Sequence, residues 1–493
     1  MPEEDATIFL HSKYDPEKEA CRFVHAQNIA FYPAFLIISE PGKSYLASVL
    51  RQRFPQTVLV ALRYTIDQFI ETDSLWDFVW RPDSQINIEE FLFNLISDEY
   101  IPLSIFLAWK PSDIFWPEIS QCVWEGISSV LKMQKSIMFT RSHFGKKWLT
   151  NMFRNTLYAR HIVKPGTTSK HIFLAASGPS LEKHVPVNRK AFYICTVSSS
   201  LCFLKSKKIE PDLCIATDGG YWALAQFRDI SKFIPLVFPL EAALPHFVLE
   251  KNPLSIVQYG SELEKKLLSF IGISGDTAFR NGTVSGTAAQ YCLSLSSGCV
   301  YAAGLDFQNS CSFTHARPHV SDILVEIESD RLNPLSTSLY SRNVETASLE
   351  MYASWFASRN DSFRNRFFRL YPAGKKIQGI VEVHQNEVTP TISSISQENI
   401  NLAVNDSMTR KIQISAWIDH MISVLSNYKT DELFSNTLYN EIMQMVSYTD
   451  YIQLLKKYRS LNPVNELPVQ VSSLINKTIG FLQKMKILVI AYE

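Results

Sequence analysis

The sequence lacks an excess of charge of either sign: 48 Lys and Arg residues balance 48 Asp and Glu residues in a chain of 493. Proteins whose main partner is nucleic acid usually carry a basic excess, so we expect no nucleic-acid partner. Hydrophobic residues make up 46% and charged residues 19% of the chain, which excludes a mostly disordered protein. At roughly 100–200 residues per domain, the length predicts two to four domains.

The eight cysteines lack the spacing of a metal site, since none forms a C-x-x-C pair. Several lie in apolar runs, which predicts buried, reduced thiols and no metal centre. The sequence also lacks a basic segment followed by an apolar stretch near residue 1, and it has no run of about 18 apolar residues. We therefore expect a cytoplasmic protein with no membrane contact.

Short apolar runs recur through the middle of the chain. Six of them begin at His171, Ala191, Leu213, Ile234, Leu254 and Cys299. The first five starts lie about 20 residues apart, the length of one strand, one helix and two short loops. Such spacing predicts βαβ units and a parallel sheet that is covered on both faces. The fold class that we predict is therefore α/β, with a Rossmann-like centre.

The first part of the chain repeats this pattern less regularly. Strands are predicted at 34–39, 57–62 and 104–109, and a helix at 44–54. We therefore expect a smaller α/β domain before the central one.

Other regions have helical periodicity. Apolar residues four apart predict a helical connector near 145–159. After a Ser-, Thr- and Pro-rich segment at 388–399, interpreted as a linker, the pattern is helical to the end of the sequence. The predicted domains are an N-terminal α/β domain at 1–140, a connector at 141–165, a central Rossmann-like domain at 166–387 and a C-terminal helical domain at 388–493.

The motif S-G-P-S-L directly follows the first of the regular apolar runs. Gly178 permits a close approach of the backbone, and Pro179 suits the first turn of a helix. Ser177 and Ser180 add hydroxyl groups beside the free N–H groups of that turn. A helix start beyond the carboxyl end of a parallel strand favours a phosphate group. The motif is therefore a candidate nucleotide-binding loop, with a purely structural turn as the alternative.

A second helix start rich in hydroxyl groups reads N-G-T-V-S-G-T, at residues 281–287. Its candidate binding residues are Asn281, Gly282, Thr283, Ser285 and Thr287. Two such starts on one sheet could hold a nucleotide between them. An ordinary capped helix is the alternative.

Two aspartates and a histidine also follow predicted strands. Asp218 precedes Gly219 and Gly220, and Asp306 lies in G-L-D-F. Either carboxylate could bind a ribose, a metal or a sugar hydroxyl. His315, in the loop after Asp306, is the candidate general base because histidine titrates near neutral pH. His319, four residues further on, competes for that role.

The segment E-P-G-K-S at 40–44 resembles the end of a Walker A loop. The upstream glycine of that loop would fall at Ile37 and is absent. We therefore exclude an ATPase P-loop and expect no nucleotide in the N-terminal domain.

Taken in order, these motifs resemble those of the Maf motility-associated flagellin glycosyltransferases, whose central domain is called MptE-like after a 6-hydroxymethylpterin diphosphokinase. The connector at 145–155 and the segment at 371–380 also match. The resemblance implies a sialyltransferase-like centre that transfers a nonulosonic sugar of the sialic, pseudaminic or legionaminic type. The donor would be the CMP-activated sugar, and the acceptor would be Ser or Thr of flagellin, in support of flagellar assembly and motility. No cofactor would be required.

The resemblance also implies roles for the candidate residues. Ser177, Gly178 and Ser180 would lie at the donor phosphate or sugar. The 281–287 loop would form the second wall of the donor site, and Asp218 and Asp306 would lie at its edge. Because two hydroxyl-rich helix starts and one histidine are expected at the same sheet edge, our own hypothesis is that His315 accepts a proton from the acceptor hydroxyl as that oxygen attacks the anomeric carbon with inversion.

Two other functions stay open. The first is an ATP-dependent diphosphokinase acting on a pterin alcohol, with Mg²⁺ held by Asp218 and Asp306. The second is a flagellin-binding scaffold without catalytic activity. No motif specifies the sugar, the acceptor residues or the oligomeric state.

Overall fold

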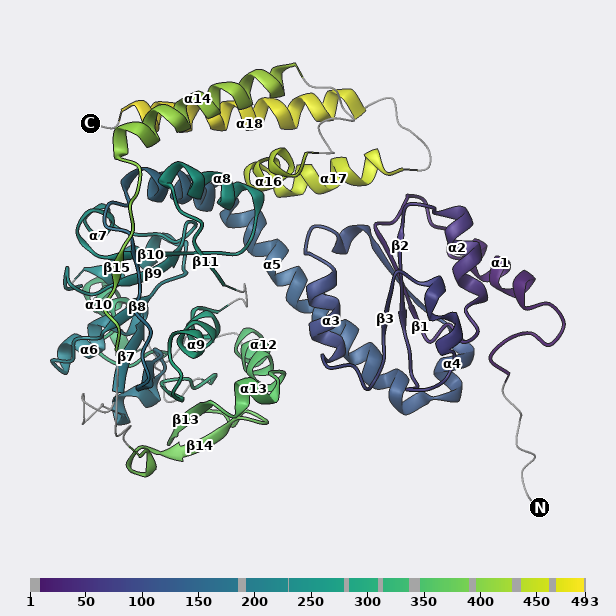
Figure 1. Cartoon of the computed structure of the whole chain (residues 1–493), viewed down its shortest axis with the longest axis horizontal. Helices are drawn as coiled ribbons and strands as arrows, with labels where there is room; N and C mark the ends of the chain where they lie inside the picture. Colours follow the sequence, from purple (N-terminus) through teal and green to yellow (C-terminus); the bar gives the residue numbers. More distant parts are fainter. Residues whose placement is uncertain are drawn as a thin grey trace. The chain divides into compact units, whose positions relative to one another are not determined.

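The computed structural model describes residues 9–184, 192–228, 230–278, 283–308, 314–336, 346–389, 396–427, 436–460 and 467–491. It divides into two compact units (Figure 1). The N-terminal unit comprises Met1–His143 with Ser447–Leu474, and the central unit comprises Phe144–Val446 with Ile475–Glu493. Two helices, α5 (Pro117–Tyr158) and α18 (Leu467–Ile490), cross from one unit to the other.

The N-terminal unit contains a parallel sheet with strand order β3-β2-β1-β4. Its strands are β1 (Phe35–Ser39), β2 (Val58–Leu62), β3 (Phe78–Trp80) and β4 (Ser104–Ala108). Its helices include α1 (Pro16–Ala26), α2 (Tyr45–Arg53), α3 (Ile88–Leu95), α4 (Lys110–Phe115) and α17 (Tyr448–Tyr458). The three predicted strands and the predicted helix are confirmed as β1, β2, β4 and α2, whereas β3 was not predicted.

The central unit contains a parallel sheet of nine strands in the order β11-β10-β9-β8-β7-β6-β12-β13-β14. These strands are β6 (His171–Ala175), β7 (Phe192–Val197), β8 (Leu213–Ile215), β9 (Leu236–Pro239), β10 (Leu254–Gln258), β11 (Asp276–Thr277), β12 (Val300–Ala303), β13 (Phe367–Tyr371) and β14 (Val381–His384). The six apolar runs correspond to β6–β10 and β12. The predicted α/β fold class is confirmed.

The side on which the chain adds strands to the central sheet changes once. From β6 the chain adds strands outward on one side as far as β11, and then adds β12, β13 and β14 on the other side. The reversal therefore lies between β6 and β12, where Ala175 is the partner of Ala303. Open α/β sheets bind ligands at such a switch point, beyond the carboxyl ends of the strands.

Helices accompany the central sheet in the intervals between strands. They are α6 (Leu201–Ser206), α7 (His246–Lys251), α8 (Glu262–Ile271), α9 (Val284–Leu295), α10 (Val320–Glu328), α12 (Thr346–Ala357) and α13 (Asp361–Arg364). Helix α9 packs on β6, β7 and β12. Because α9 connects the parallel strands β11 and β12, it runs antiparallel to them, and its first turn lies at the carboxyl edge of the sheet.

The later helices confirm the predicted helical pattern. They are α14 (Ser407–Ser426), α16 (Thr437–Val446), α17 and α18. Ile414, Ile418 and Leu425 form a buried stripe on α14, as their spacing indicates. Among the described residues, no helix combines the length and the apolar composition that a bilayer crossing requires.

Part of the segment interpreted as a linker is paired with the chain ahead of the central sheet. Within that segment, Gln397 N donates to Thr167 O at 2.9 Å, and directly after it strand β15 (Ile400–Asn401) pairs antiparallel with β5 (Val163–Lys164). Residues 390–395 of the same segment lie outside the described residues.

Only some of the cysteines are buried. Cys195, Cys214 and Cys292 are buried free thiols, whereas Cys21 and Cys122 are exposed. The prediction of buried thiols is therefore wrong for the latter two, which lie on solvent-facing positions of α1 and α5. In the described parts of the chain, no cluster of three or more His, Cys, Asp or Glu side chains could hold a metal ion.

Candidate functional site

Three motifs that are far apart in the sequence meet at the switch point. Gly178 N donates to Gly304 O at 2.7 Å, so the loop after β6 contacts the loop after β12. Ala316 N donates to Ser177 O at 2.8 Å and brings the segment that carries His315 to the same place. The S-G-P-S-L motif, the G-L-D-F motif and the described part of F-T-H-A, Thr314–Ala316, thus form one structural junction.

Asp306 holds this junction together. One carboxylate oxygen accepts a hydrogen bond from Ser180 N at 2.7 Å, and the other accepts one from Gly374 N at 3.1 Å. The backbone oxygen of Asp306 accepts from Lys375 N at 2.8 Å, and the residue is only 5% exposed. Asp306 therefore links the ends of β6, β12 and β13 and has little surface left for a substrate.

The structure provides fewer free backbone donors than the phosphate site predicted after β6 would need. Pro179–Lys183 form a five-residue 3₁₀ helix, η3, and not the longer helix start that the prediction needs. The N–H group of Ser180, which a phosphate would use, already binds the Asp306 carboxylate. A negative charge does lie at this turn, as a donor-rich helix start favours, but the protein supplies it.

Gly178 is required by the close approach of the loops. A Cβ atom at this position would lie 2.6 Å from the Asp306 carboxylate and 2.6 Å from Gly304 O. Its backbone φ is −66°, which any residue adopts. The need for glycine is therefore steric, and it arises from the junction itself.

Several buried donor and acceptor atoms in the same region have no hydrogen-bond partner among the residues that the structure describes. They are Ser180 Oγ, His319 Nε2, and Nε and Nη2 of Arg369. Buried polar atoms without a partner are uncommon and often mark the place of a water, an ion or a ligand. These atoms supply hydroxyl, imidazole and guanidinium groups, a combination that suits an oxyanion.

Arg369, on β13, is the strongest charge in this group. Its side chain is fully buried, and Nη1 donates to Lys375 O at 2.7 Å and to Glu382 Oε1 at 3.0 Å. Burial lowers the pKa of the guanidinium, while the negative charges of Glu382 and Asp306 raise it. Arg369 therefore lies close to Asp306, and two of its nitrogens have no partner among the residues that the structure describes, so they could donate to an anion.

His315 and His319 form a stacked pair, with ring centroids 4.0 Å apart and planes 6° from parallel. The hydroxyl of Thr314 lies 2.8 Å from His315 Nδ1, and that of Ser321 lies 2.6 Å from His319 Nδ1. Burial lowers the pKa of His315, and burial together with the neighbouring His315 lowers the pKa of His319 to about 3. Both rings are therefore neutral at pH 7, and a neutral imidazole can accept a proton.

The second predicted wall is described only in part, because Asn281 and Gly282 lie outside the described residues. Thr283 is the N-cap of α9, and its hydroxyl accepts from Gly286 N at 2.8 Å. Thr287 is buried, and its hydroxyl donates to Thr283 O at 3.4 Å. The hydroxyl groups of Thr283 and Thr287 thus form hydrogen bonds within the first turn of α9, as expected for an ordinary capped helix, the alternative interpretation of this motif. The third hydroxyl group of the motif belongs to Ser285.

Asp218 and Gly219 lie away from this junction. Asp218 is exposed, and its carboxylate accepts from Gly220 N at 2.7 Å, which stabilises the turn after β8. Three inter-strand spacings separate β8 from β12, roughly 14 Å in all. The structure therefore does not bring Asp218 and Asp306 to one point.

Sequence reasoning missed the role of α5 at this edge. Trp148 packs on Gly219, where a Cβ atom would lie 2.3 Å from the indole ring. Asn151 Nδ2 donates to Gly219 O and Glu241 O, at 3.2 and 2.9 Å. Asn155 donates to two further carbonyl oxygens in the loop after β9. The asparagines four residues apart were the available signal, because that spacing places two amide groups on one helix face.

Arg369 was also missed. It interrupts the apolar strand F-F-R-L-Y, and a charged residue inside such a run was the signal for it.

Residues 146–311 match the model of a family described as 6-hydroxymethylpterin diphosphokinase MptE-like. The matched segment begins within α5 and includes the loops after β6 and β8 and the start of the loop after β12. It also contains Trp148, Asn151 and Asn155, so the contacts between α5 and the sheet edge lie within the segment that matches the family model.

Two comparisons extend beyond this segment. An uncharacterized protein of Treponema pallidum (strain Nichols) is 36% identical over 272 residues, which are 55% of this chain and 61% of that protein. The chain thus matches less than two thirds of this relative. The structure is similar to that of a Maf glycosyltransferase from Magnetospirillum magneticum AMB-1, with a TM-score of 0.48 and 11% identity over 97% of this chain and 83% of the other. A likeness of that size carries no functional argument.

Proposed function

We propose that this protein is a glycosyltransferase that moves a nonulosonic sugar from its CMP donor to Ser or Thr of flagellin. The observation that carries the proposal is the junction at the switch point. There, three motifs of the Maf pattern meet around Asp306, beside a neutral histidine and buried donor groups that have no partner among the described residues. The sugar, the donor and the flagellin acceptor come from the motif resemblance, and the geometry supports a site for an anionic substrate.

In this proposal His315 is the general base. It takes the proton from the acceptor hydroxyl while that oxygen forms a bond to the anomeric carbon, and CMP leaves with the electrons of the broken bond. The lowered pKa of His315 supports the role, because the ring is unprotonated at neutral pH. Thr314, bound to Nδ1, orients the ring and leaves Nε2 for the acceptor.

The donor phosphate would be held by groups that the junction leaves free. Arg369 Nε and Nη2 would donate to its oxygens, and Ser180 Oγ would add a hydroxyl group. Ser285, in the first turn of α9, would approach from the second wall. Donors fixed by the fold stabilise the charge that develops on the departing CMP without reorganisation. Asp306 would be a positioning residue and would not touch the reacting atoms.

The description of the MptE-like family favours a second candidate, diphosphate transfer from ATP to a pterin alcohol. That reaction uses Mg²⁺, and its expected ligands were Asp218 and Asp306. The two carboxylates follow strands roughly 14 Å apart, whereas Mg²⁺ requires oxygen ligands at about 2.1 Å. The positions of these aspartates therefore favour sugar transfer over this form of the kinase reaction.

Calorimetric titration of the full chain with CMP, and separately with ATP and Mg²⁺, tests the proposal. We expect micromolar binding of CMP, and we expect Ser180→Ala to weaken it without lowering the melting temperature. A transfer assay with a CMP-activated nonulosonic sugar and flagellin should then show a large loss of kcat in His315→Gln. His246→Gln is the matched control, because His246 is half exposed and lies on α7.

Each other outcome has a distinct meaning. Tight binding of Mg-ATP with no binding of CMP would overturn sugar transfer and support the kinase. Flagellin binding with no affinity for either nucleotide would support a scaffold without catalysis. Wild-type transfer rates in His315→Gln would remove His315 from the mechanism while leaving the donor site standing.

A further inference from the structure

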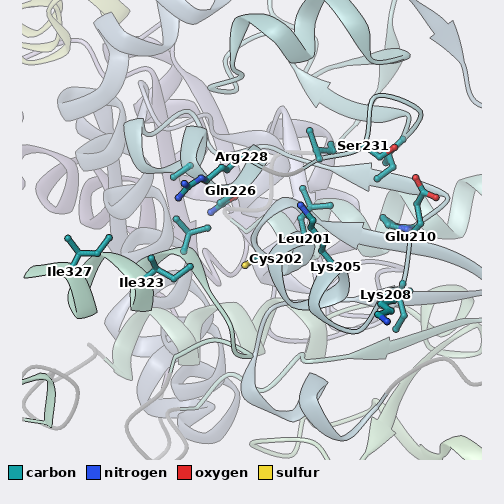
Figure 2. Close-up of a pocket in the computed structure, with 16 residues that line it drawn as sticks. Leu201, Cys202, Lys205, Lys208, Glu210, Gln226, Arg228, Ser231, Ile323 and Ile327 are labelled. Carbon is teal, nitrogen blue, oxygen red and sulfur yellow. The ribbon is translucent and has the colours of Figure 1, made fainter.

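The central unit contains a cavity of about 360 Å³ that none of the predicted site residues lines (Figure 2). Its walls come from α6, from the 3₁₀ helix η5 (Tyr221–Phe227) with the residues after it, and from α10. Its volume lies within the range of small-molecule sites, roughly 300–1,000 Å³. The cavity therefore has the size of a ligand site, and neither the motifs nor the proposed mechanism assigns it a ligand.

Aliphatic side chains dominate the wall. The largest are Leu201, Ile209, Ile230, Ile234, Ile323 and Ile327. No aromatic ring lines the cavity among the described residues, so the stacking surface that a nucleobase or a pterin normally uses is missing there. An aliphatic wall without rings suits a flexible hydrocarbon chain.

Ile327 is a strongly exposed apolar residue of this wall. It is 74% exposed, although it lies four residues after Ile323 and on the same side of α10. An exposed isoleucine on its own is ordinary, but two isoleucines that face one cavity form a continuous apolar surface. A bound alkyl chain would cover that surface.

The charge at the rim selects the sign of the ligand. Lys205, Lys208 and Arg228 line the cavity, against a single acidic lining residue in the described part of the chain, Glu210. Figure 2 shows Lys208 on the side of the cavity away from Ile323 and Ile327. An amphipathic ligand could thus place an anionic head near the lysines and its tail against α10.

We propose that this cavity binds a single-chain alkyl anion, with a carboxylate or phosphate head at Lys205 and Lys208 and the alkyl tail along the isoleucines of α10. The ligand is distinct from the CMP donor. Val320 lines the cavity, and in the sequence it directly follows His319, the N-cap residue of α10. Its occupant would therefore lie next to the stacked histidines without using them.

Calorimetric titration of the full chain tests this proposal with four probes below their critical micelle concentrations. Dodecanoate and dodecyl phosphate carry the anionic heads, dodecyltrimethylammonium carries the same tail with a cationic head, and inorganic phosphate is the head alone. We expect one-to-one micromolar binding of at least one anionic probe. The ammonium probe should bind at least about tenfold more weakly, and phosphate alone should not bind detectably. The stronger of the two anionic probes identifies the head group.

Matched variants locate the site. Ile327→Glu places a charge on the tail surface and should raise the Kd of the better anionic probe at least about tenfold. Ile412→Glu, on the exposed face of α14, is the control and should bind like the wild type. Lys208→Glu should weaken the anionic probes and reduce their advantage over the ammonium probe. Lys207→Glu should change neither, because Lys207 does not line the cavity and packs over Phe203.

Three results would overturn the proposal: no saturable binding of either anionic probe at 1 mM, equal affinity for the ammonium probe, or unchanged binding in Ile327→Glu. Ser180→Ala separates this site from the donor site, because it should weaken CMP binding and leave dodecanoate binding unchanged. If the wild type does not bind CMP but does bind the anionic probes, the proposed transferase is contradicted, whereas this inference is supported.

Discussion

In each of the two parallel sheets of this chain, the side on which strands are added changes once. The loop at that switch point contacts a buried charge, which is positive in the N-terminal unit and negative in the central unit. In the N-terminal unit the reversal lies between β1 and β4, and the loop after β1 surrounds the guanidinium of Arg63. In the central unit it lies between β6 and β12, and the loop after β6 meets the carboxylate of Asp306. The same topological position has therefore acquired two different chemistries.

The N-terminal loop presents acceptors to its centre. Arg63 is fully buried and donates to Glu40, to Gly42 O and to the Ser44 hydroxyl from that loop. It also donates to Asp73 and to Thr72, so all five of its N–H groups are used. This arrangement gives a physical reason for the prediction that E-P-G-K-S is not a phosphate loop. Its inward groups bind a cation, and the cation is part of the chain.

The central junction presents donors. Backbone N–H groups of Ser180 and Gly374 bind Asp306, and two nitrogens of the nearby Arg369 have no partner in the described part of the chain. A buried arginine with all donors satisfied stabilises a fold, whereas one with free donors is available to a ligand. Of these two buried arginines, only Arg369 has nitrogens without a partner among the described residues.

Removing Arg63 should have the largest effect. Arg63→Met leaves the buried Glu40 carboxylate without its charged partner, and breaking a buried pair in this way costs about 3–5 kcal/mol. Hydrogen exchange followed by mass spectrometry should show faster exchange in β1 and β2. The control is Arg51→Met, whose ion pair with Asp77 is 39% exposed on both sides and is worth at most about 1 kcal/mol. Equal exchange in the two variants would contradict the interpretation of Arg63 as the closing charge.

The fold could be predicted from the sequence where strands are fully buried. Parallel strands covered on both faces appear as continuous apolar runs, and β6, β7 and β10 have that composition. Strands β3 and β11 have three and two residues, too few for a periodic signal. Short edge strands of this kind become visible only when their partners are known.

The candidate site was predictable as a set of positions but not as a set of contacts. Ser180, Asp306 and His315 were recognised because each follows a strand. The bond between Ser180 N and Asp306 joins residues 126 positions apart, and no local pattern encodes it. The free donors of Arg369 depend on what fails to pack around them, which is a property of the whole fold. Sequence patterns therefore locate candidate groups but do not show which of them the protein already occupies.

A Cβ atom at the central junction should have the next largest effect. Gly178→Ala forces the Asp306 carboxylate and Gly304 O apart, and such overpacking costs about 1–3 kcal/mol. The melting temperature of the central unit should fall, and CMP binding should weaken with it. Gly480→Ala on α18 is the control, because nothing lies within 4 Å of the new atom and alanine favours a helix by about 0.5–1 kcal/mol. A Gly178→Ala protein as stable as the wild type would mean that the loops approach less closely.

The stacked histidines should make the central unit sensitive to acid. His319 has a pKa of about 3 in the folded protein and near 6.5 when unfolded. Below pH 6.5 the unfolded chain binds a proton that the folded chain does not, so stability is lost as the pH falls from 6.5 towards 3. The slope is about 1.4 kcal/mol per pH unit. Urea unfolding at pH 7.0 and 5.5 should show this loss in the wild type and a smaller one in His319→Gln. Parallel losses in both proteins would assign the acid sensitivity to other groups.

The smallest expected effect on stability is that of Ser180→Ala, and it is best measured against the matching serine of the N-terminal loop, Ser44. Ser44 Oγ accepts from Arg63 and from Trp76 Nε1, so Ser44→Ala leaves buried donors unpaired and should cost about 1–3 kcal/mol. Ser180 Oγ has no partner among the described residues, so Ser180→Ala should change the free energy of unfolding by no more than about 0.5 kcal/mol. Calorimetry should show the reverse order for CMP, with affinity lowered by Ser180→Ala and unchanged by Ser44→Ala. If Ser180→Ala destabilises the protein as much as Ser44→Ala does, its hydroxyl is already satisfied, and the central edge is closed in the same sense as the N-terminal one.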